Sequence, residues 1–368
     1  MTRTPASDAL KNTFSGKRVL ITGHTGFKGG WLTYWLARIG AEITGYALAP
    51  DTTPAMFDVL RLADICEHHL GDVRNREKVE STVASARPDF VFHLAAQPLV
   101  RRSYLEPAET IETNVLGTAN LLEAVRRAGR PCVVVVVTSD KCYENREGNF
   151  AFRETDPLGG SDIYSMSKAA AELVAKSYRN SFFPVDQIHR HGIRIATARA
   201  GNVIGGGDWA ADRIVPDCIR SLGRGEPIAV RNPRAIRPWQ HVLEPLSGYL
   251  ALARSLAGEH AAIYCDAWNL GPVSFEARTV RDLVMEVIRA WGNGQWNDVS
   301  DPGAPPEAST LRLSIDKAVS ELQWRPRWSF EESCRHTVAW YRAHSERPSS
   351  TGMRELTESQ IGEYLAEN

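Results

Sequence analysis

Residues 18–30 read Arg-Val-Leu-Ile-Thr-Gly-His-Thr-Gly-Phe-Lys-Gly-Gly, and this stretch decides the fold. The apolar run that ends at Thr22 predicts a buried strand, and the apolar residues after Gly29 predict a helix. Gly23, Gly26 and Gly29 allow a tight turn, a close approach of a pyrophosphate to the backbone, and packing of the helix on the strand. A glycine-rich turn without a ligand is the alternative, but a position between the first strand and the first helix favours a dinucleotide site.

Short apolar runs alternate with helical patterns from residue 17 to about residue 205. Strands are expected at 18–22, 42–47, 68–73, 89–96, 132–139 and 193–200. Helices are expected at about 29–39, 74–86, 110–128 and 161–180. The five consecutive valines 133–137 show no polar alternation, which is typical of a strand covered on both faces. The pattern predicts an α/β fold with a Rossmann-type, doubly wound parallel sheet.

The 368 residues exceed one ordinary domain, and the composition changes after Gly205. Glycines 205–207 form a breaker cluster, and arginines and prolines crowd the stretch that follows. We expect a mobile N-terminal arm at 1–14, a dinucleotide-binding domain at 15–205, a smaller C-terminal α/β region at 206–345 that mainly binds the substrate, and a tail at 346–368.

Composition narrows the classes of partner. Lys and Arg together number 43 against 44 Asp and Glu, so the excess of basic residues that binds nucleic acid is missing. The first fifteen residues have no apolar core, which argues against a signal peptide or a membrane span. Six scattered cysteines without Cys-x-x-Cys spacing indicate reduced thiols in the cytoplasm, and the histidines have no third ligand at zinc-like spacing, so no metal is expected. We expect a cytoplasmic protein with small-molecule ligands.

The residues after the second and third strands bear on the choice of cofactor. An NAD site commonly has an acidic residue near the end of the second strand, where this chain has Gly-Tyr-Ala-Leu at 45–48 and Asp51 just beyond. No basic residue in that stretch suits a 2′-phosphate, so NAD is favoured over NADP. Asp72, before Val73, is placed to accept from an adenine amino group, or to cap the next helix before Arg74.

Two pairs of titratable residues suggest the chemistry. Tyr164 and Lys168 are four apart on a predicted helix and share one face, so the ammonium can lower the pKa of the phenol towards that of a general base. Ser139, at the end of the fifth strand, can share the substrate proton with the tyrosine. Asp140 and Lys141 follow it, at a strand end where they can carry out an acid/base elimination.

Several motifs occur in a specific order: Thr-Gly-x-x-Gly-Phe-x-Gly at 22–29, Leu-Ala-Ala-Gln at 94–97, Asn-Val-x-Gly-Thr at 114–118, Ser-Asp at 139–140, Tyr-x-x-x-Lys at 164–168 and Gly-Asn-Val at 201–203. Together they resemble, over nearly the whole chain, the extended short-chain dehydrogenase/reductase family. Within it, the runs at 23–29, 138–145, 201–209 and 237–246 closely resemble its sugar-nucleotide dehydratase branch. The resemblance implies NAD as the cofactor, with contacts from Gly23, Thr25, Gly26, Phe27, Gly29, Asp72, Val73, Leu94, Ala95, Ala96, Tyr164 and Lys168.

The resemblance also implies a three-step reaction. Tyr164, poised by Lys168 and Ser139, takes the proton of the sugar 4-hydroxyl while hydride passes from C4 to NAD. The ketone acidifies the C5 proton, and water is lost across C5 and C6. Relatives use an Asp-Glu pair here, so Asp140 is the expected acid and Lys141 the expected base, with the reverse assignment open. A lysine base must be desolvated or lie near another cation. Hydride then returns to C6 and gives a 4-keto-6-deoxy sugar.

On resemblance alone, the substrate is CDP-glucose, with Asn202 near the sugar and Asn269 at the pyrophosphate. Arg213 and Arg237 are the expected phosphate clamps, because guanidinium groups match phosphate oxygens. In relatives, helices equivalent to those at 110–128 and 161–180 pair across a two-fold axis, which implies a homodimer or higher homo-oligomer. Packing inside one subunit is the competing explanation for their apolar faces.

Two other functions fit the fold. A sugar-nucleotide 4-epimerase shares the cofactor, Tyr164 and Lys168, but needs no acid/base pair for elimination, so Asp140 and Lys141 argue against it. A non-catalytic dinucleotide-sensing protein need not keep a proton-transfer tyrosine, so Tyr164 argues against that.

Overall fold

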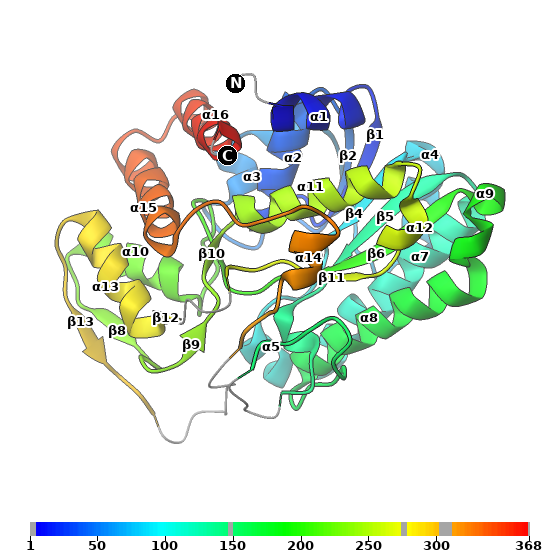
Figure 1. The fold of residues 1–368 in the computed structure, drawn as a ribbon. Coiled ribbons are helices and arrows are strands. Elements are labelled where there is room, and N and C mark those ends of the chain that lie inside the picture. Colours follow the sequence, from blue (N-terminus) through cyan, green and yellow to red (C-terminus); the bar gives the residue numbers. More distant parts are fainter. Residues whose placement is uncertain (1–4, 146–149, 274–277, 302–310, 367–368) are drawn as a thin grey trace.

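The computed structural model describes residues 5–145, 150–273, 278–301 and 311–366 (Figure 1). Its centre is a seven-stranded parallel sheet in the order β11-β6-β5-β4-β1-β2-β3. The strands are β1 (Arg18–Thr22), β2 (Glu42–Ala47), β3 (Glu67–Leu70), β4 (Phe90–His93), β5 (Cys132–Val137), β6 (Ile193–Arg199) and β11 (Ala267–Asn269). The predicted doubly wound α/β fold is confirmed. Its strand order reverses between β1 and β4, where such sheets bind ligands.

Helices cover both faces of the sheet (Figure 1). Every residue of β5 is buried, as the valine run predicts. Val133, Val135 and Val137 pack in one apolar cluster with α2 (Phe27–Arg38) and α11 (Leu243–Ala257). Val134 and Val136 pack in the other cluster with α4 (Arg76–Ala86), α7 (Gly117–Ala128) and α8 (Ile163–Phe182).

The helix expected at 110–128 forms with a widened turn in its first half. Its segments are α6 (Pro107–Ile111), the π-helical turn η2 (Glu112–Leu116) and α7. The π turn carries the buried Asn114, whose Oδ1 accepts from the Gln97 backbone at 2.8 Å and whose Nδ2 donates to Ser167 Oγ at 2.8 Å. Asn114 therefore ties the segment after β4 to α8, the helix expected to carry the catalytic tyrosine.

The smaller region beside the sheet contains short paired strands, of which β7 precedes residue 205, and three longer helices. The paired strands are β7 (Val203–Ile204) with β10 (Gln240–His241), β9 (Ile236–Arg237) with β12 (Arg278–Thr279), and β8 (Ile228–Val230) with β13 (Trp296–Asp298). The helices are α10 (Ile214–Arg224), α13 (Val280–Trp291) and α15 (Phe330–Glu346). However, β11 and α11 belong to the large sheet and its covering layer, so residue 205 does not separate the two regions cleanly.

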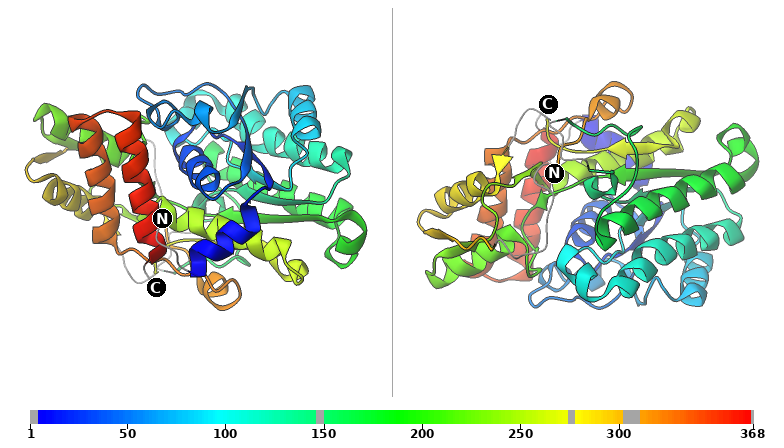
Figure 2. Two further views of the ribbon diagram at one scale, coloured as in Figure 1. Left: turned by 90° about the horizontal axis from the view of Figure 1, so that it is seen from above. Right: turned by 90° about the horizontal axis from the view of Figure 1, so that it is seen from below.

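The structure corrects the expectations for both ends of the chain. Residues Pro5–Phe14 form α1, and the fully buried Phe14 ring lies 4.8 Å from that of Phe90. Residues Ser350–Ala366 form α16, which lies beside α15 (Figure 2) and buries Ile361 and Tyr364. Apolar packing therefore holds both segments where a mobile arm and a tail were expected.

Shorter helices complete the described chain: α3 (Met56–Val59), η1 (Leu62–Asp64), α5 (Val100–Leu105), η3 (Asp140–Cys142), η4 (Val185–Gln187), α9 (Ile188–His191), α12 (Ala261–Tyr264) and α14 (Asp316–Ser320). Over the described ranges, no helix combines the length and apolar character needed to span a bilayer.

Candidate active site

A cavity of about 720 Å³ lies at the carboxyl ends of the central strands, where the sheet meets the smaller region. All the residues expected to be catalytic line it: Ser139, Asp140, Lys141, Tyr164 and Lys168. Four of the five expected substrate residues line it, namely Ser139, Asn202, Arg213 and Arg237, as do the expected cofactor residues Phe27, Leu94 and Ala96. The fold thus brings together residues that lie more than two hundred positions apart in the sequence.

The glycine turn after β1 is packed so closely that side chains have no room. Gly23 has φ +78°, and a Cβ there would lie 2.7 Å from the backbone nitrogen of Ala95. A Cβ on Gly29 would lie 2.1 Å from the carbonyl oxygen of Gly23. Gly26 is exposed directly before α2, so a pyrophosphate can reach the first turn of that helix. The turn therefore fits a dinucleotide, as predicted.

Tyr164 and Lys168 project from the first turns of α8. The helix begins there because Asp162 caps it, with its carboxylate accepting from the backbone and the hydroxyl of Ser165 at 2.9 and 2.6 Å. Both cavity-lining side chains are almost fully buried, with 8% of Tyr164 and 6% of Lys168 exposed. The predicted shared face is confirmed.

The electrostatics of this pair differ from the expectation. Burial raises the pKa of Tyr164 to about 12, although a hydrogen bond with Ser139 and the charge of Arg213 act in the opposite direction. Burial also lowers the pKa of Lys168 to about 8, against the charge of Glu172. In the protein alone the pKa of the phenol lies above its ordinary value, because desolvation outweighs the hydrogen bond with Ser139 and the charge of Arg213; a lowering by Lys168 stays a prediction.

Asp140 is held at the start of η3, with 2% of its surface exposed. Its Oδ1 accepts from Ser139 Oγ at 3.0 Å, and Ser139 Oγ in turn accepts from the Lys141 backbone at 3.2 Å. Its Oδ2 is buried and has no hydrogen-bond partner among the described residues. Gly201 faces that carboxylate, and a Cβ there would lie 2.0 Å from Oδ2. A buried, unpartnered acceptor beside a cavity suits a ligand hydroxyl.

Asn202, Arg213 and Arg237 come to the cavity from the segments after β6. Arg213 lies directly before α10 without capping it, and its Nη1 donates to Asp208 Oδ2 at 2.8 Å. Arg237 lies in β9 with only 6% exposed, and its Nη1 donates to the Ile236 carbonyl at 2.9 Å. Asn202 has a left-handed backbone with φ +46°, a conformation that asparagine tolerates better than most residues. Both guanidinium groups line the cavity, and their contact with a phosphate stays a prediction.

Asn269 does not line the cavity, so its expected contact with a pyrophosphate does not fit the structure. It is fully buried in β11, and its side chain is already engaged. Its Nδ2 donates to the carbonyls of Phe152 and Ser314 at 2.9 and 3.1 Å, and its Oδ1 accepts from Tyr143 at 2.6 Å. Asn269 therefore joins distant segments of this chain.

The other expected cofactor residues follow the ends of β1, β3 and β4. Thr25 Oγ1 donates to the Leu48 carbonyl at 2.9 Å and fixes the turn to the end of β2. Partial burial acts to raise the pKa of Asp72, but the hydrogen bonds with Arg74 outweigh it and lower that pKa. Arg74 Nε donates to Asp72 Oδ2 at 2.8 Å. Val73 is buried. The N-cap of α4 is Asn75, so Asp72 does not cap that helix, and its contact with adenine stays a prediction.

Lys28 also lines the cavity, and sequence reasoning did not assign it a role. It is the second residue of α2. Burial, together with the positive charges of Lys168 and Arg213, lowers the pKa of Lys28 to about 7. The charge of Asp140 opposes this shift. The available signal was a lysine inside the glycine-rich turn, where its side chain could only point towards the ligand or the solvent.

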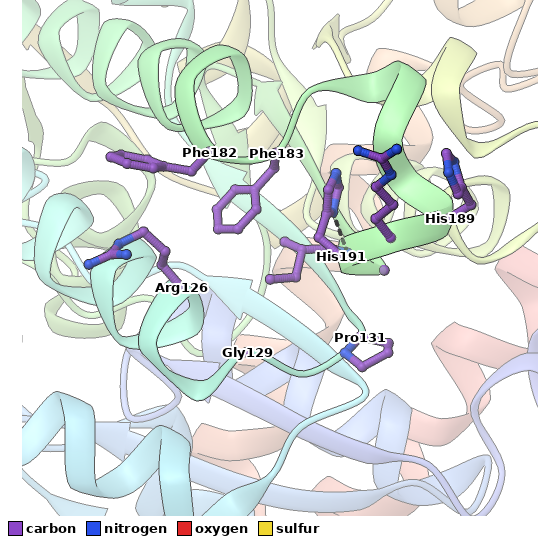
Figure 3. Close-up of a pocket in the computed structure, with 10 residues that line it drawn as sticks. Arg126, Gly129, Pro131, Phe182, Phe183, His189 and His191 are labelled. Atoms are coloured by element: carbon purple, nitrogen blue, oxygen red, sulfur yellow. Dashed lines mark hydrogen bonds between the residues drawn. The ribbon is translucent and has the colours of Figure 1, made fainter.

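A second depression of about 390 Å³ lies at the opposite, amino ends of β5 and β6 (Figure 3). Two of its polar side chains, Arg126 and His191, already have partners. Arg126 donates to both carboxylate oxygens of Glu123 at 2.7 Å. His191 Nε2 lies 3.1 Å from the Pro184 carbonyl, and its Nδ1 accepts from Ile193 at 3.0 Å. The cavity at the carboxyl ends is therefore the candidate active site.

Comparison with known families identifies the class of protein to which this fold and this site belong. The model of the GDP-mannose 4,6 dehydratase family matches residues 20–337, and the chain belongs to this family. The chain is 49% identical over 333 residues to the CDP-glucose 4,6-dehydratase of Salmonella typhimurium. The aligned residues cover 90% of this chain and 92% of that one.

Among solved structures, a dTDP-glucose 4,6-dehydratase of Streptomyces venezuelae with NAD bound is similar, with a TM-score of 0.75 and 24% identity over 89% of this chain and 98% of that one. A UDP-glucose 4-epimerase of Thermotoga maritima also has a TM-score of 0.75, with 21% identity over 89% of this chain and 99% of that one. These two structures support the fold.

Proposed function

We propose that the protein is an NAD-dependent sugar-nucleotide 4,6-dehydratase that converts CDP-glucose to CDP-4-dehydro-6-deoxy-D-glucose and water. One observation carries the choice of reaction. The buried, unpartnered Oδ2 of Asp140 lies in the same cavity as Tyr164 and Lys168. A 4-epimerase needs the tyrosine and lysine but has no use for a buried acid beside the substrate. The 49% identity to a CDP-glucose 4,6-dehydratase supports the same reaction and the CDP-sugar.

NAD fits the glycine turn, and when bound it supplies the hydride acceptor of the first step and the donor of the last. Tyr164 takes the proton of the sugar 4-hydroxyl. A buried phenol with a pKa of about 12 accepts that proton as phenolate only when positive charge stabilises it, and Lys168 and Arg213 both lie near. Ser139, which is bonded to the phenol, orients it towards the substrate oxygen.

The residues of η3 carry out the loss of water across C5 and C6. Asp140 donates a proton to the departing C6 hydroxyl through its unpartnered oxygen, and Lys141 takes the proton from C5. The reverse assignment uses the same two residues. Lys28 is a second amine in the cavity, and a pKa of about 7 suits proton transfer near neutral pH. Comparing Lys28→Met with Lys141→Met therefore tests which amine serves as the base.

The reaction has a direct test. CDP-glucose incubated with the protein and NAD should lose the mass of one water, and in D₂O the product should carry deuterium at C5. Deuterium placed at C4 of the substrate should appear in the new methyl group. A product of unchanged mass with inverted C4 would identify an epimerase, and unchanged sugar would identify a binding protein.

We also propose that the protein is cytoplasmic and forms a homodimer or a higher homo-oligomer. Large apolar side chains are exposed on the segment around α8, where a second copy can cover them. Leu116 in η2 is 53% exposed and Leu173 in α8 is 51% exposed. Sedimentation of the wild type should show an oligomer, and Leu173→Arg should shift it towards the monomer. An unchanged sedimentation coefficient would assign this face another role.

A further inference from the structure

A fully buried ion pair lies directly behind the active site. Arg199 in β6 donates from Nη2 to Glu172 Oε2 at 2.8 Å, and each side chain is only 3% exposed. Removing two charges from water costs several kcal/mol for each ion, and their attraction does not always offset this. Glu172 lies one turn beyond Lys168 on α8. The pair is therefore worth examining for a role beyond stability.

The carboxylate of the pair holds the segment just before Asp140. Thr138 Oγ1 donates to Glu172 Oε1, and Thr197 Oγ1 donates to Oε2 at 2.7 Å. Thr138 is two residues before Asp140, and its backbone nitrogen also bonds to the Ala198 carbonyl at 2.9 Å. The chain therefore enters η3 from a fixed position.

The guanidinium of the pair holds the segment just after Lys141. Arg199 Nη1 donates to the Tyr143 hydroxyl at 2.8 Å, and that hydroxyl donates to Asn269 Oδ1 at 2.6 Å. The Tyr143 ring stacks on Phe152 with centroids 4.8 Å apart. Tyr143 is two residues after Lys141, so the chain also leaves η3 from a fixed position.

We propose that Thr138, Tyr143, Glu172 and Arg199 form a clamp that positions Asp140 and Lys141 for the loss of water. This inference rests on the proposed function. The expected redox pair, Tyr164 and Lys168, is carried by the long helix α8, whereas the elimination pair lies on a three-residue turn. A turn this short has no rigidity of its own, so its geometry depends on what holds its two ends. Loosening the clamp should slow water loss more than the first oxidation.

Tyr143→Phe is the most selective test, because it removes one hydroxyl and keeps the stacked ring. Arg199 keeps its bond to Glu172, so the charge pair survives. Since a misplacement of about 1 Å can cost about a hundredfold in rate, we expect kcat to fall about tenfold with KM within about twofold of wild type. The first appearance of reduced nicotinamide in a single turnover should keep its wild-type rate, and reduced cofactor should accumulate in the steady state.

Tyr249→Phe is the matched control. Tyr249 is fully buried in α11, away from the cavity, and its hydroxyl has no hydrogen-bond partner among the described residues. It should leave both rates unchanged. Thr138→Val, which loosens the other end of the clamp, should repeat the Tyr143→Phe pattern.

Two results would overturn the clamp. One is a Tyr143→Phe enzyme with unchanged kcat. The other is equal slowing of cofactor reduction and water loss, which would indicate a general structural role. Failure of the wild type to release water from CDP-glucose would instead refute the proposed function, so the two failures are distinguishable.

Discussion

Gly201→Ala tests the role of Asp140 without altering any charged group. A Cβ on Gly201 would lie 2.0 Å from Asp140 Oδ2 and 2.1 Å from its Cγ, whereas real Cβ contacts do not come below 3.0 Å. The carboxylate must therefore retreat by about 1 Å, and it is too deeply buried to swing into solvent. Such a displacement predicts about a 10- to 100-fold slower loss of water. Overpacking should also lower the free energy of unfolding by about 1–3 kcal/mol.

Three measurements check this prediction. Single-turnover absorbance of the reduced nicotinamide reports the first oxidation, product mass reports the loss of water, and urea denaturation reports stability. Gly223→Ala is the control, because Gly223 is an exposed residue of α10 whose Cβ would meet nothing within 4 Å. A Gly201→Ala enzyme that releases water at the wild-type rate would show that the position of Asp140 does not matter, and the assignment of Asp140 would fail.

Three further predictions concern single side chains. Lys141→Met should still reduce the cofactor but then stall, because the amine expected to take the C5 proton is gone. Normal turnover, measured by product mass, would remove Lys141 from the mechanism. Tyr164→Phe should abolish even the first reduction, and reduced cofactor forming at the wild-type rate would contradict its role. Burial raises the pKa of Glu244 to about 7, so the folded protein holds a proton there that the unfolded chain releases near its ordinary pKa of 4.5. The stabilisation is present at low pH and is lost as pH rises through about 7, a loss on the order of 1–3 kcal/mol between about pH 5 and about pH 8. Glu244→Gln should flatten this dependence in urea denaturation, and an identical pH profile would refute it.

Local pattern was enough to predict six of the seven strands of the sheet, all but β11, and the centre of the site. The run of valines in β5 has no polar face because helices cover both sides of the strand, and that information is contained in the run itself. The four-residue spacing of Tyr164 and Lys168 likewise fixes a shared face wherever the helix packs. These predictions needed only the geometry of one element at a time.

The errors concern contacts between distant segments. Asn269 looked available to a ligand because nothing near it in sequence shows that Phe152, Ser314 and Tyr143 already use its side chain. The N-terminal segment looked mobile because Phe14 finds its partner, Phe90, on a strand much later in the chain. The raised pKa of Tyr164 has the same origin, since the extent of its burial depends on the whole assembled cavity.

The fold cannot by itself choose between dehydratase and epimerase, because solved structures of both classes are equally similar to this chain. Both reactions remove hydride from C4, so the glycine turn, Tyr164 and Lys168 serve either one. The distinction must come from groups that act only after the ketone has formed. Asp140 and Lys141 are such groups, on a turn that a buried ion pair supports from both ends. Because the proposed clamp serves the elimination, an epimerase with the same sheet has no need to hold this turn so firmly. The expected selectivity of Tyr143→Phe for water loss follows directly from that difference.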